Sequence, residues 1–90
     1  MFWKVIRTET FSRMFKKYSK NKKFIKALDK KIQRLKEDPS SVGGYLSGKL
    51  HGYKSTRVIK KLRLIFKINE KESSVFLVGI DYRKFDYKNF

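Results

Sequence analysis

The stretch over residues 54–68 constrains the fold more than any other part of the chain. Apolar residues occupy the even positions of its second half: Leu62, Leu64, Phe66 and Ile68. Arg63 and Lys67 lie between them, and only Ile65 departs from the alternation. A period of two is typical of a β-strand with one buried face. We therefore expect residues 54–68 to form a β-hairpin that buries one face and presents arginines on the other.

The register of this hairpin is restricted, because a slip of one residue sends a whole set of side chains to the wrong face. A two-residue loop would direct Arg57 into the core. A three-residue loop over 59–61 instead places Arg57 directly opposite Arg63. The same register sets Val58 opposite Leu62. Like charges that face each other destabilise a sheet, so this register suggests an anion bound between the two arginines.

Residues 74–80 form a nearly continuous apolar run, which predicts an interior strand. A five-residue loop over 69–73 would pair this strand with the hairpin and set Gly79 opposite Arg63. Glycine at that position would leave open space beside the arginine, as where a ligand lies close to a sheet. The same parity places two further residues on the arginine face: Asp81 and Arg83.

The first half of the chain predicts one strand and two helices. The strand covers residues 2–7, the first helix about 10–18 and the second helix about 22–37. Thr8 and Thr10 each offer an N-cap to the first helix. Pro39 ends the second helix, because the residue before a proline avoids the α region. This second helix has an apolar stripe, and basic residues cover most of the remainder of its surface.

These elements predict an α+β fold. The N-terminal strand and a two-helix hairpin would pack on one face of a small antiparallel β-sheet, and the opposite face would be basic and concave. We expect residues 1–90 to form a single domain, because the chain is too short for a second core.

The composition restricts the partners. The chain carries 24 lysines and arginines against 8 acidic residues, a formal net charge of +16. Such a surplus predicts polyanionic partners, while 40% hydrophobic and 16% aromatic residues exclude a disordered basic tail. There is no cysteine, which excludes disulfides and thiolate metal sites. Because no apolar run reaches the roughly 18 residues of a membrane span, we expect a cytoplasmic protein without membrane association.

The arginines are the best candidates for chemistry. No serine–histidine–aspartate arrangement, metal-ligand cluster or phosphate-binding glycine loop is found in the sequence, and we predict no cofactor. His51 is the sole histidine, so a two-histidine acid–base pair within one chain is excluded. Arginine side chains bind phosphate oxygens in pairs and keep their charge.

Three segments resemble the conserved core of the RelE/ParE toxin superfamily. They are Leu-His-Gly-Tyr-Lys-Ser-Thr-Arg-Val over 50–58, Arg-Leu-Ile-Phe over 63–66, and residues 75–83. The spacing is particularly similar to the YoeB/Txe-type pattern L-x-G-x-x-S-x-R-[IV], followed after four residues by R-L-[IV]-[YF]. The order of the predicted elements also matches, so the resemblance extends over nearly the whole chain.

The resemblance implies a toxin of a toxin–antitoxin system. Its ribonuclease branch cuts mRNA in the ribosomal A site, through attack of the 2′-hydroxyl on the phosphodiester. By this resemblance Arg63 would hold the scissile phosphate and Arg57 would assist. Arg83 falls where relatives place an arginine or a histidine, and Lys54 is the candidate general base, since like charge nearby lowers a lysine pKa.

The resemblance also implies residues that bind the substrate and a protein partner. Tyr87 would stack on a base, with Tyr82 and Phe90 as competitors. Apart from the resemblance, we also expect Lys60 and Lys61 to bind the substrate. The implied partners are the ribosome, its mRNA and an acidic, RelB-like antitoxin that covers the basic face.

Two departures from the YoeB type bear on the mechanism. The glutamate general base of that type would fall at about Gly44, and the terminal histidine–tyrosine pair is absent. Both departures favour a mechanism in which basic residues, and not a glutamate or a histidine, supply most of the catalysis. Two alternatives stay open: a ParE-like inhibitor of DNA gyrase, and a non-catalytic protein that binds nucleic acid or the ribosome.

Overall fold

The computed structural model describes residues 2–48 and 51–82, which form two helices and five strands. In chain order these are β1 (Lys4–Arg7), α1 (Glu9–Phe15), α2 (Lys22–Glu37), β2 (Gly44–Tyr45), β3 (Lys54–Ile59), β4 (Leu62–Asn69) and β5 (Ser74–Tyr82). Short 3₁₀ helices follow α1 and α2, at Lys16–Tyr18 and Pro39–Ser41. The described part of the chain includes no helix with the length and hydrophobicity needed to cross a membrane.

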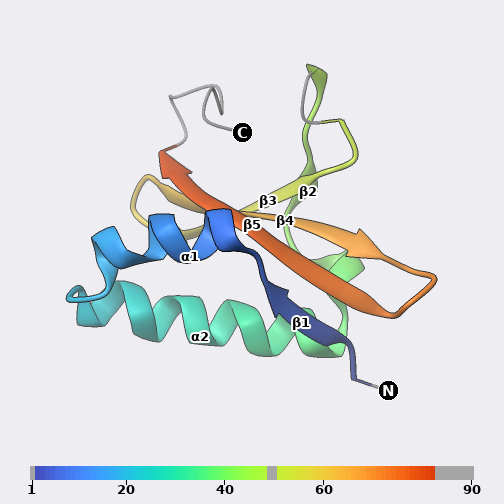
Figure 1. The fold of residues 1–90 in the computed structure, drawn as a ribbon, viewed down its shortest axis with the longest axis horizontal. Helices are drawn as coiled ribbons and strands as arrows, with labels where there is room; N and C mark the ends of the chain where they lie inside the picture. Colours follow the sequence, from blue (N-terminus) through green and yellow to red (C-terminus); the bar gives the residue numbers. More distant parts are fainter. Residues whose placement is uncertain (1, 49–50, 83–90) are drawn as a thin grey trace.

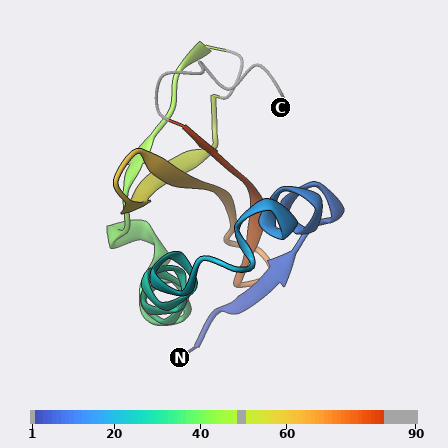
Figure 2. The same cartoon turned by 90° about the vertical axis from the view of Figure 1, so that its left-hand side faces the viewer.

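The strands form one mixed sheet in the order β1-β5-β4-β3-β2 (Figure 1). The three long strands β3, β4 and β5 pair antiparallel, as predicted, whereas β1 pairs parallel with β5. The sheet is therefore mixed rather than antiparallel throughout. Viewed from the side, α1 and α2 lie against the same face of the sheet (Figure 2). The predicted α+β class and the position of the helical hairpin are confirmed.

Side-chain caps fix where both helices begin. The Thr8 hydroxyl accepts a hydrogen bond from the Phe11 amide at 3.2 Å and donates one to the Leu77 carbonyl at 2.7 Å, so it caps α1 and ties it to β5. The Asn21 side chain accepts from the Phe24 amide at 3.0 Å and starts α2. The second helix has the predicted bounds, whereas α1 ends at Phe15 and continues only as a 3₁₀ turn.

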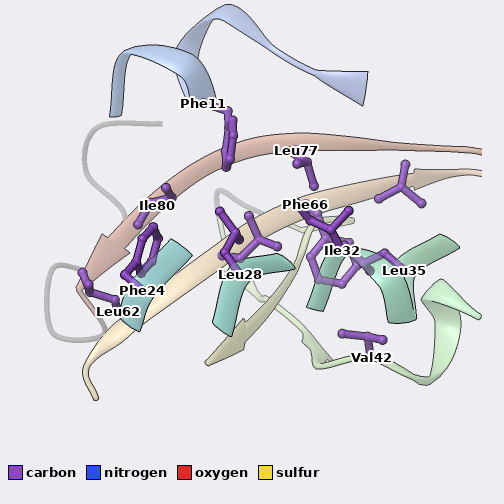
Figure 3. Packing of buried hydrophobic residues seen from close by; sticks show 12 residues of the cluster. Phe11, Phe24, Leu28, Ile32, Leu35, Val42, Leu62, Phe66, Leu77 and Ile80 are labelled. Carbon is purple, nitrogen blue, oxygen red and sulfur yellow. The ribbon is translucent and has the colours of Figure 1, made fainter. Parts of the chain in front are cut away.

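The core lies between the helices and the sheet (Figure 3). Its buried side chains come from both helices, from the loop after α2 and from the strands β4 and β5: Phe11, Phe24, Leu28, Ile32, Leu35, Val42, Leu62, Leu64, Phe66, Val75, Leu77 and Ile80. The even positions of β4 point into this core, as the alternation predicts. The odd positions of β4 therefore point to the other face of the sheet.

The β3–β4 register confirms one prediction and corrects another. Arg57 is directly opposite Arg63, as expected, but Ile59 rather than Val58 faces Leu62. A β-bulge at Val58 inserts one residue into β3, so a two-residue turn coexists with the arginine pair. The three-residue loop was therefore a wrong prediction.

The predicted β4–β5 register was wrong. Asn69 pairs with Ser74, which leaves a four-residue loop, and a bulge follows between Ile65 and Phe66 along the ladder. Gly79 is consequently opposite Ile65, and Asp81 is opposite Arg63. The shorter loop brings Phe66 opposite Leu77, so core residues of both strands meet, which the predicted pairing of Phe66 with Phe76 did not achieve.

The strand β2 was not predicted, because residues 42–44 suggest only a flexible connector. It pairs with β3, with Gly44 opposite Ser55 and Tyr45 opposite Lys54. Gly43 precedes it with φ of 64°, and a Cβ at this position would overlap the carbonyl oxygen of Ser55. Glycine is thus required both by the left-handed backbone and by the close approach to β3.

Candidate phosphate site on the open sheet face

Two arginines from neighbouring strands face each other on the side of the sheet opposite the helices. Arg57 lies in β3 and is exposed, and Arg63 lies in β4 and is partly buried. Among the side chains that the structure describes, in residues 2–48 and 51–80, no acidic group forms an ion pair with either guanidinium. The backbone of Asp81 is opposite that of Arg63 in the neighbouring strand β5. Two positive charges that face each other destabilise a sheet. A bound phosphate would neutralise them and accept several of their hydrogen bonds.

Ser55 orients one of these arginines. Its hydroxyl oxygen accepts a hydrogen bond from Nε of Arg63 at 3.2 Å, and Ser55 is only 3% exposed. This bond uses one of the five N–H donors of the guanidinium and leaves the four at its outer end available. The backbone of Ser55 is in turn held by β2, because Gly44 pairs with it and Gly43 packs against its carbonyl group.

The role of Ser55 was not identified from the sequence, although two signals were available. Ser55 is the serine of the L-x-G-x-x-S-x-R pattern, and it lies two residues before Arg57, on the same face of a strand. Its hydrogen bond to Arg63 depends on the β3–β4 register, which the bulge makes difficult to predict.

Lys54 is not part of the arginine cluster. It is opposite Phe66 on the helix side of the sheet and is only 2% exposed. Its ammonium group donates to the carbonyl oxygens of Ser40 at 2.8 Å and Pro39 at 3.5 Å, and it lies 5.0 Å from the Tyr45 ring centre. Burial lowers the pKa of Lys54, and the nearby Asp38 carboxylate partly opposes the shift. The cause of the low pKa is therefore desolvation rather than the arginines.

The other predicted site residues lie at the β3–β4 turn and at or beyond the end of β5. Lys60 and Lys61 form the exposed turn between β3 and β4. The backbone of Tyr82 is opposite Leu62 at the end of β5. Three predicted residues lie outside the described residues: Arg83, Tyr87 and Phe90.

One further cation shares the arginine face. Lys67 is exposed and lies four residues after Arg63 in the unbroken strand β4, so both side chains leave the same face. Its ammonium group lies 5.2 Å from the ring centre of Tyr53. The face of the sheet opposite the helices therefore carries two cations along β4, Arg63 and Lys67, with the buried Ile65 between them. The alternation in the sequence already contained this signal.

Comparison with known proteins identifies the fold. No family model and no curated protein matches the sequence. A chain of the toxin–antitoxin complex RelBE2 from Mycobacterium tuberculosis aligns with 92% of this chain and 93% of its own length, at 24% identity and a TM-score of 0.76. A YoeB/ParE toxin from Agrobacterium tumefaciens aligns with 89% of this chain and 98% of its own length, at 15% identity and a TM-score of 0.77.

A third structure, a mutant of the E. coli toxin RelE in the free state, aligns with 93% of this chain and 86% of its own length. Its identity is 19% and its TM-score is 0.71. The chain therefore has the fold of the RelE/YoeB/ParE-type toxins, and the structural resemblance predicted from the sequence is confirmed.

Proposed function

We propose that this protein is the toxin of a toxin–antitoxin pair and a ribosome-dependent endoribonuclease that cleaves mRNA in the A site. One observation carries the proposal. Arg57 and Arg63 face each other on the side of a RelE-like sheet opposite the helices, without an acidic partner among the described side chains of residues 2–48 and 51–80, and Ser55 orients Arg63. The overall charge of +16 supports a polyanionic substrate.

The proposed reaction uses the substrate's own nucleophile. The 2′-oxygen of one nucleotide attacks the adjacent phosphorus, the O2′–P bond forms, and the P–O5′ bond breaks. The 2′-hydroxyl gives up a proton and the leaving 5′-oxygen gains one, which yields a 2′,3′-cyclic phosphate and a 5′-hydroxyl. Negative charge accumulates on the phosphate oxygens as the new bond forms.

The arginine pair would act on this accumulating charge. Arg63, held at Nε by Ser55, would present its outer N–H groups to one or two phosphate oxygens, and Arg57 would bind from the neighbouring strand. A single preorganised donor of this kind is worth on the order of 10²–10³ in rate. Electrostatic stabilisation and positioning of the substrate are thus the main contributions that we assign to the described residues.

The described residues offer no clear general base or acid for the proton transfers. Gly44 stands where the YoeB type has its glutamate, and Lys54 is turned to the other side of the sheet. We therefore do not propose Lys54 as the general base. From the resemblance, the proposal keeps Arg83 as a third cation and Tyr87 or Tyr82 as a base-stacking residue. It also keeps Lys60 and Lys61 as RNA contacts.

An acidic antitoxin is part of the proposal. The similar chain from Mycobacterium tuberculosis was solved within a toxin–antitoxin complex. A basic face with two facing arginines suits an acidic protein as well as RNA. Both the ribosome and such a partner would place the protein in the cytoplasm.

Translation of a defined mRNA with the purified protein, followed by primer extension, tests this proposal. We expect cuts at A-site codons that require ribosomes, and a loss of at least about 100-fold in cleavage rate for Arg63→Ala. Arg34→Ala, which removes an exposed arginine of α2, is the matched control and should cleave normally. A wild-type protein that leaves the translated mRNA intact would contradict the proposal.

A gyrase-directed activity is the second candidate, because one of the similar structures is described as a YoeB/ParE toxin. Inhibition of DNA supercoiling by purified protein, with translated mRNA left intact, would favour this candidate over the first.

A further inference from the structure

A cavity of about 460 Å³ lies between the α1–α2 connection and the β3–β4 turn. These two segments meet at the same end of the molecule (Figure 1). Its walls combine apolar and basic groups from both segments: Tyr18, Asn21, Lys23, Ile59, Lys60, Lys61 and Leu62. The volume is within the range of small-ligand sites. The function proposed above uses Lys60 and Lys61 as RNA contacts but assigns no role to the cavity itself.

The floor of the cavity is the end of the hydrophobic core. Ile59 and Leu62 are directly opposite each other in the sheet, and Leu62 lies beside Phe24 at this end of the core (Figure 3). Tyr18 adds an aromatic wall, and its ring lies 5.3 Å from that of Phe24. Apolar and aromatic walls of this kind accept the face of a nucleobase.

The rim of the cavity is strongly basic. Lys23, Lys60 and Lys61 are all exposed, and none of the seven described residues that line the cavity is acidic. Lys60 adopts φ of 51°, a left-handed conformation in which glycine or asparagine is the usual residue of a two-residue turn. A lysine in this unfavourable conformation suggests that its ammonium group is used.

We propose that this cavity is a second nucleotide site, which binds one base of a single-stranded RNA on its floor and the adjoining phosphates with the three lysines. The inference rests on the proposed function, in which RNA binds the arginine pair. Lys61 precedes Arg63 by only two residues, so one RNA strand that passes around the turn reaches both sites. Compact ammonium groups suit phosphates as point charges, and a continuous polyanion explains both clusters with one ligand.

Binding of a labelled oligoribonucleotide over a series of salt concentrations tests this site. Ribose 2′-O-methyl groups prevent cleavage, and fluorescence anisotropy gives the affinity. For each of Lys23→Gln, Lys60→Asn and Lys61→Gln, we expect weaker binding and a slope of log K against log[salt] that is smaller by about 0.7, the value for one contact to single-stranded nucleic acid. Lys26→Gln and Lys30→Gln, which remove exposed lysines farther along α2, are matched controls and should leave the slope unchanged.

Lys60→Asn separates binding from folding. Asparagine tolerates the left-handed conformation better than lysine, so this variant should melt at the same or a higher temperature while it binds RNA less tightly. A loss of affinity in this variant is then not a loss of folded protein.

Three results would overturn the inference. The cavity variants and the α2 controls could reduce the slope equally, which indicates general attraction only. The cavity variants could bind RNA as the wild type does. They could also lose affinity for a glutamate-rich peptide while RNA binding stays intact, which identifies a protein-docking surface. Arg63→Ala in the same assay reports separately on the proposed function: if it alone weakens binding, the arginine site stands and the cavity site fails.

Discussion

At the scale of single residues, the proposed site depends on a hydrogen bond between Ser55 and Arg63. A free arginine side chain samples many rotamers, and ordering it for a phosphate carries an entropic cost at each binding event. The bond at 3.2 Å fixes the base of the guanidinium before the substrate arrives. Ser55 is therefore a positioning residue, which acts through Arg63.

Ser55→Ala should lower kcat for mRNA cleavage by about tenfold, with a much smaller change in KM, because the phosphate is bound but less well oriented. The lost hydrogen bond should cost about 1 kcal/mol of the free energy of unfolding. Ser55→Thr keeps the hydroxyl and should restore most of kcat. Equal values of kcat for Ser55→Ala and the wild type would remove Ser55 from the site.

A lysine beside arginines suggests a catalytic base, but the position of Lys54 indicates a structural role. Its ammonium group bonds the carbonyl oxygens of the 3₁₀ turn after α2 and lies beside the ring of Tyr45. Lys54→Met keeps a side chain of similar length without the charge. We expect this variant to cleave mRNA at nearly the wild-type rate. A large loss of kcat in folded Lys54→Met protein would show that Lys54 takes part in catalysis.

The pH dependence of stability provides a second measurement on Lys54. Burial lowers the pKa of Lys54 in the folded state below its ordinary value of 10.5, so the unfolded chain binds more protons as the pH approaches that value. Stability contributed by this residue therefore rises with pH from the folded-state pKa up to about 10.5. Urea unfolding should show this rise in the wild type relative to Lys54→Met. A constant difference between the two proteins over this range would contradict the assignment.

At the scale of the elements, the two-residue strand β2 is the part that links the loop after α2 to the site. Gly43, which precedes β2, and Gly44, which begins it, differ in whether they tolerate a side chain. A Cβ at Gly43 would overlap the Ser55 carbonyl oxygen and would sit on a backbone with φ of 64°, whereas a Cβ at Gly44 would meet nothing within 4 Å. The two positions therefore form a natural pair of test and control.

Gly43→Ala should lower the free energy of unfolding by more than about 1 kcal/mol, because both the left-handed backbone and the overlap are unfavourable. It should also reduce cleavage, since Ser55 must move. Gly44→Ala should change both quantities little. Urea denaturation and the cleavage rate measure the two effects, and similar results for the two variants would show that the contact at Gly43 does not matter.

The positions of the helices and long strands were largely predictable from the sequence, whereas the pairing registers between the strands were not. Helical spacing and the caps at Thr8 and Asn21 are local signals, and they locate α1 and α2 closely. Bulges are different, because a single extra residue such as Val58 changes every pairing beyond it. The arginine pair was predicted because the core face restricts the register, although the pair forms with a two-residue turn and a bulge instead of the predicted loop. The role of Ser55 and the strand β2 were not predicted, because both depend on contacts between neighbouring strands and not on the pattern within one segment.

At the scale of the whole molecule, the charge of +16 affects folding as well as binding. Mutual repulsion of the basic groups destabilises the compact state. Salt screens this repulsion, with a Debye length of about 30 Å at 0.01 M and about 10 Å at 0.1 M. The melting temperature of the isolated protein should therefore rise between these salt concentrations, and a fall over the same range would contradict this view of the charge.

The measurement that tests the central claim most directly is the rate of ribosome-dependent mRNA cleavage by Arg63→Lys beside Arg34→Lys. Both variants keep the net charge, but lysine cannot reproduce the planar, paired donors of a guanidinium or the bond at Nε. The account predicts a loss of about 100-fold or more for Arg63→Lys and an almost unchanged rate for Arg34→Lys. Cleavage by Arg63→Lys at the wild-type rate would show that the arginine pair supplies charge alone and does not form the catalytic phosphate site.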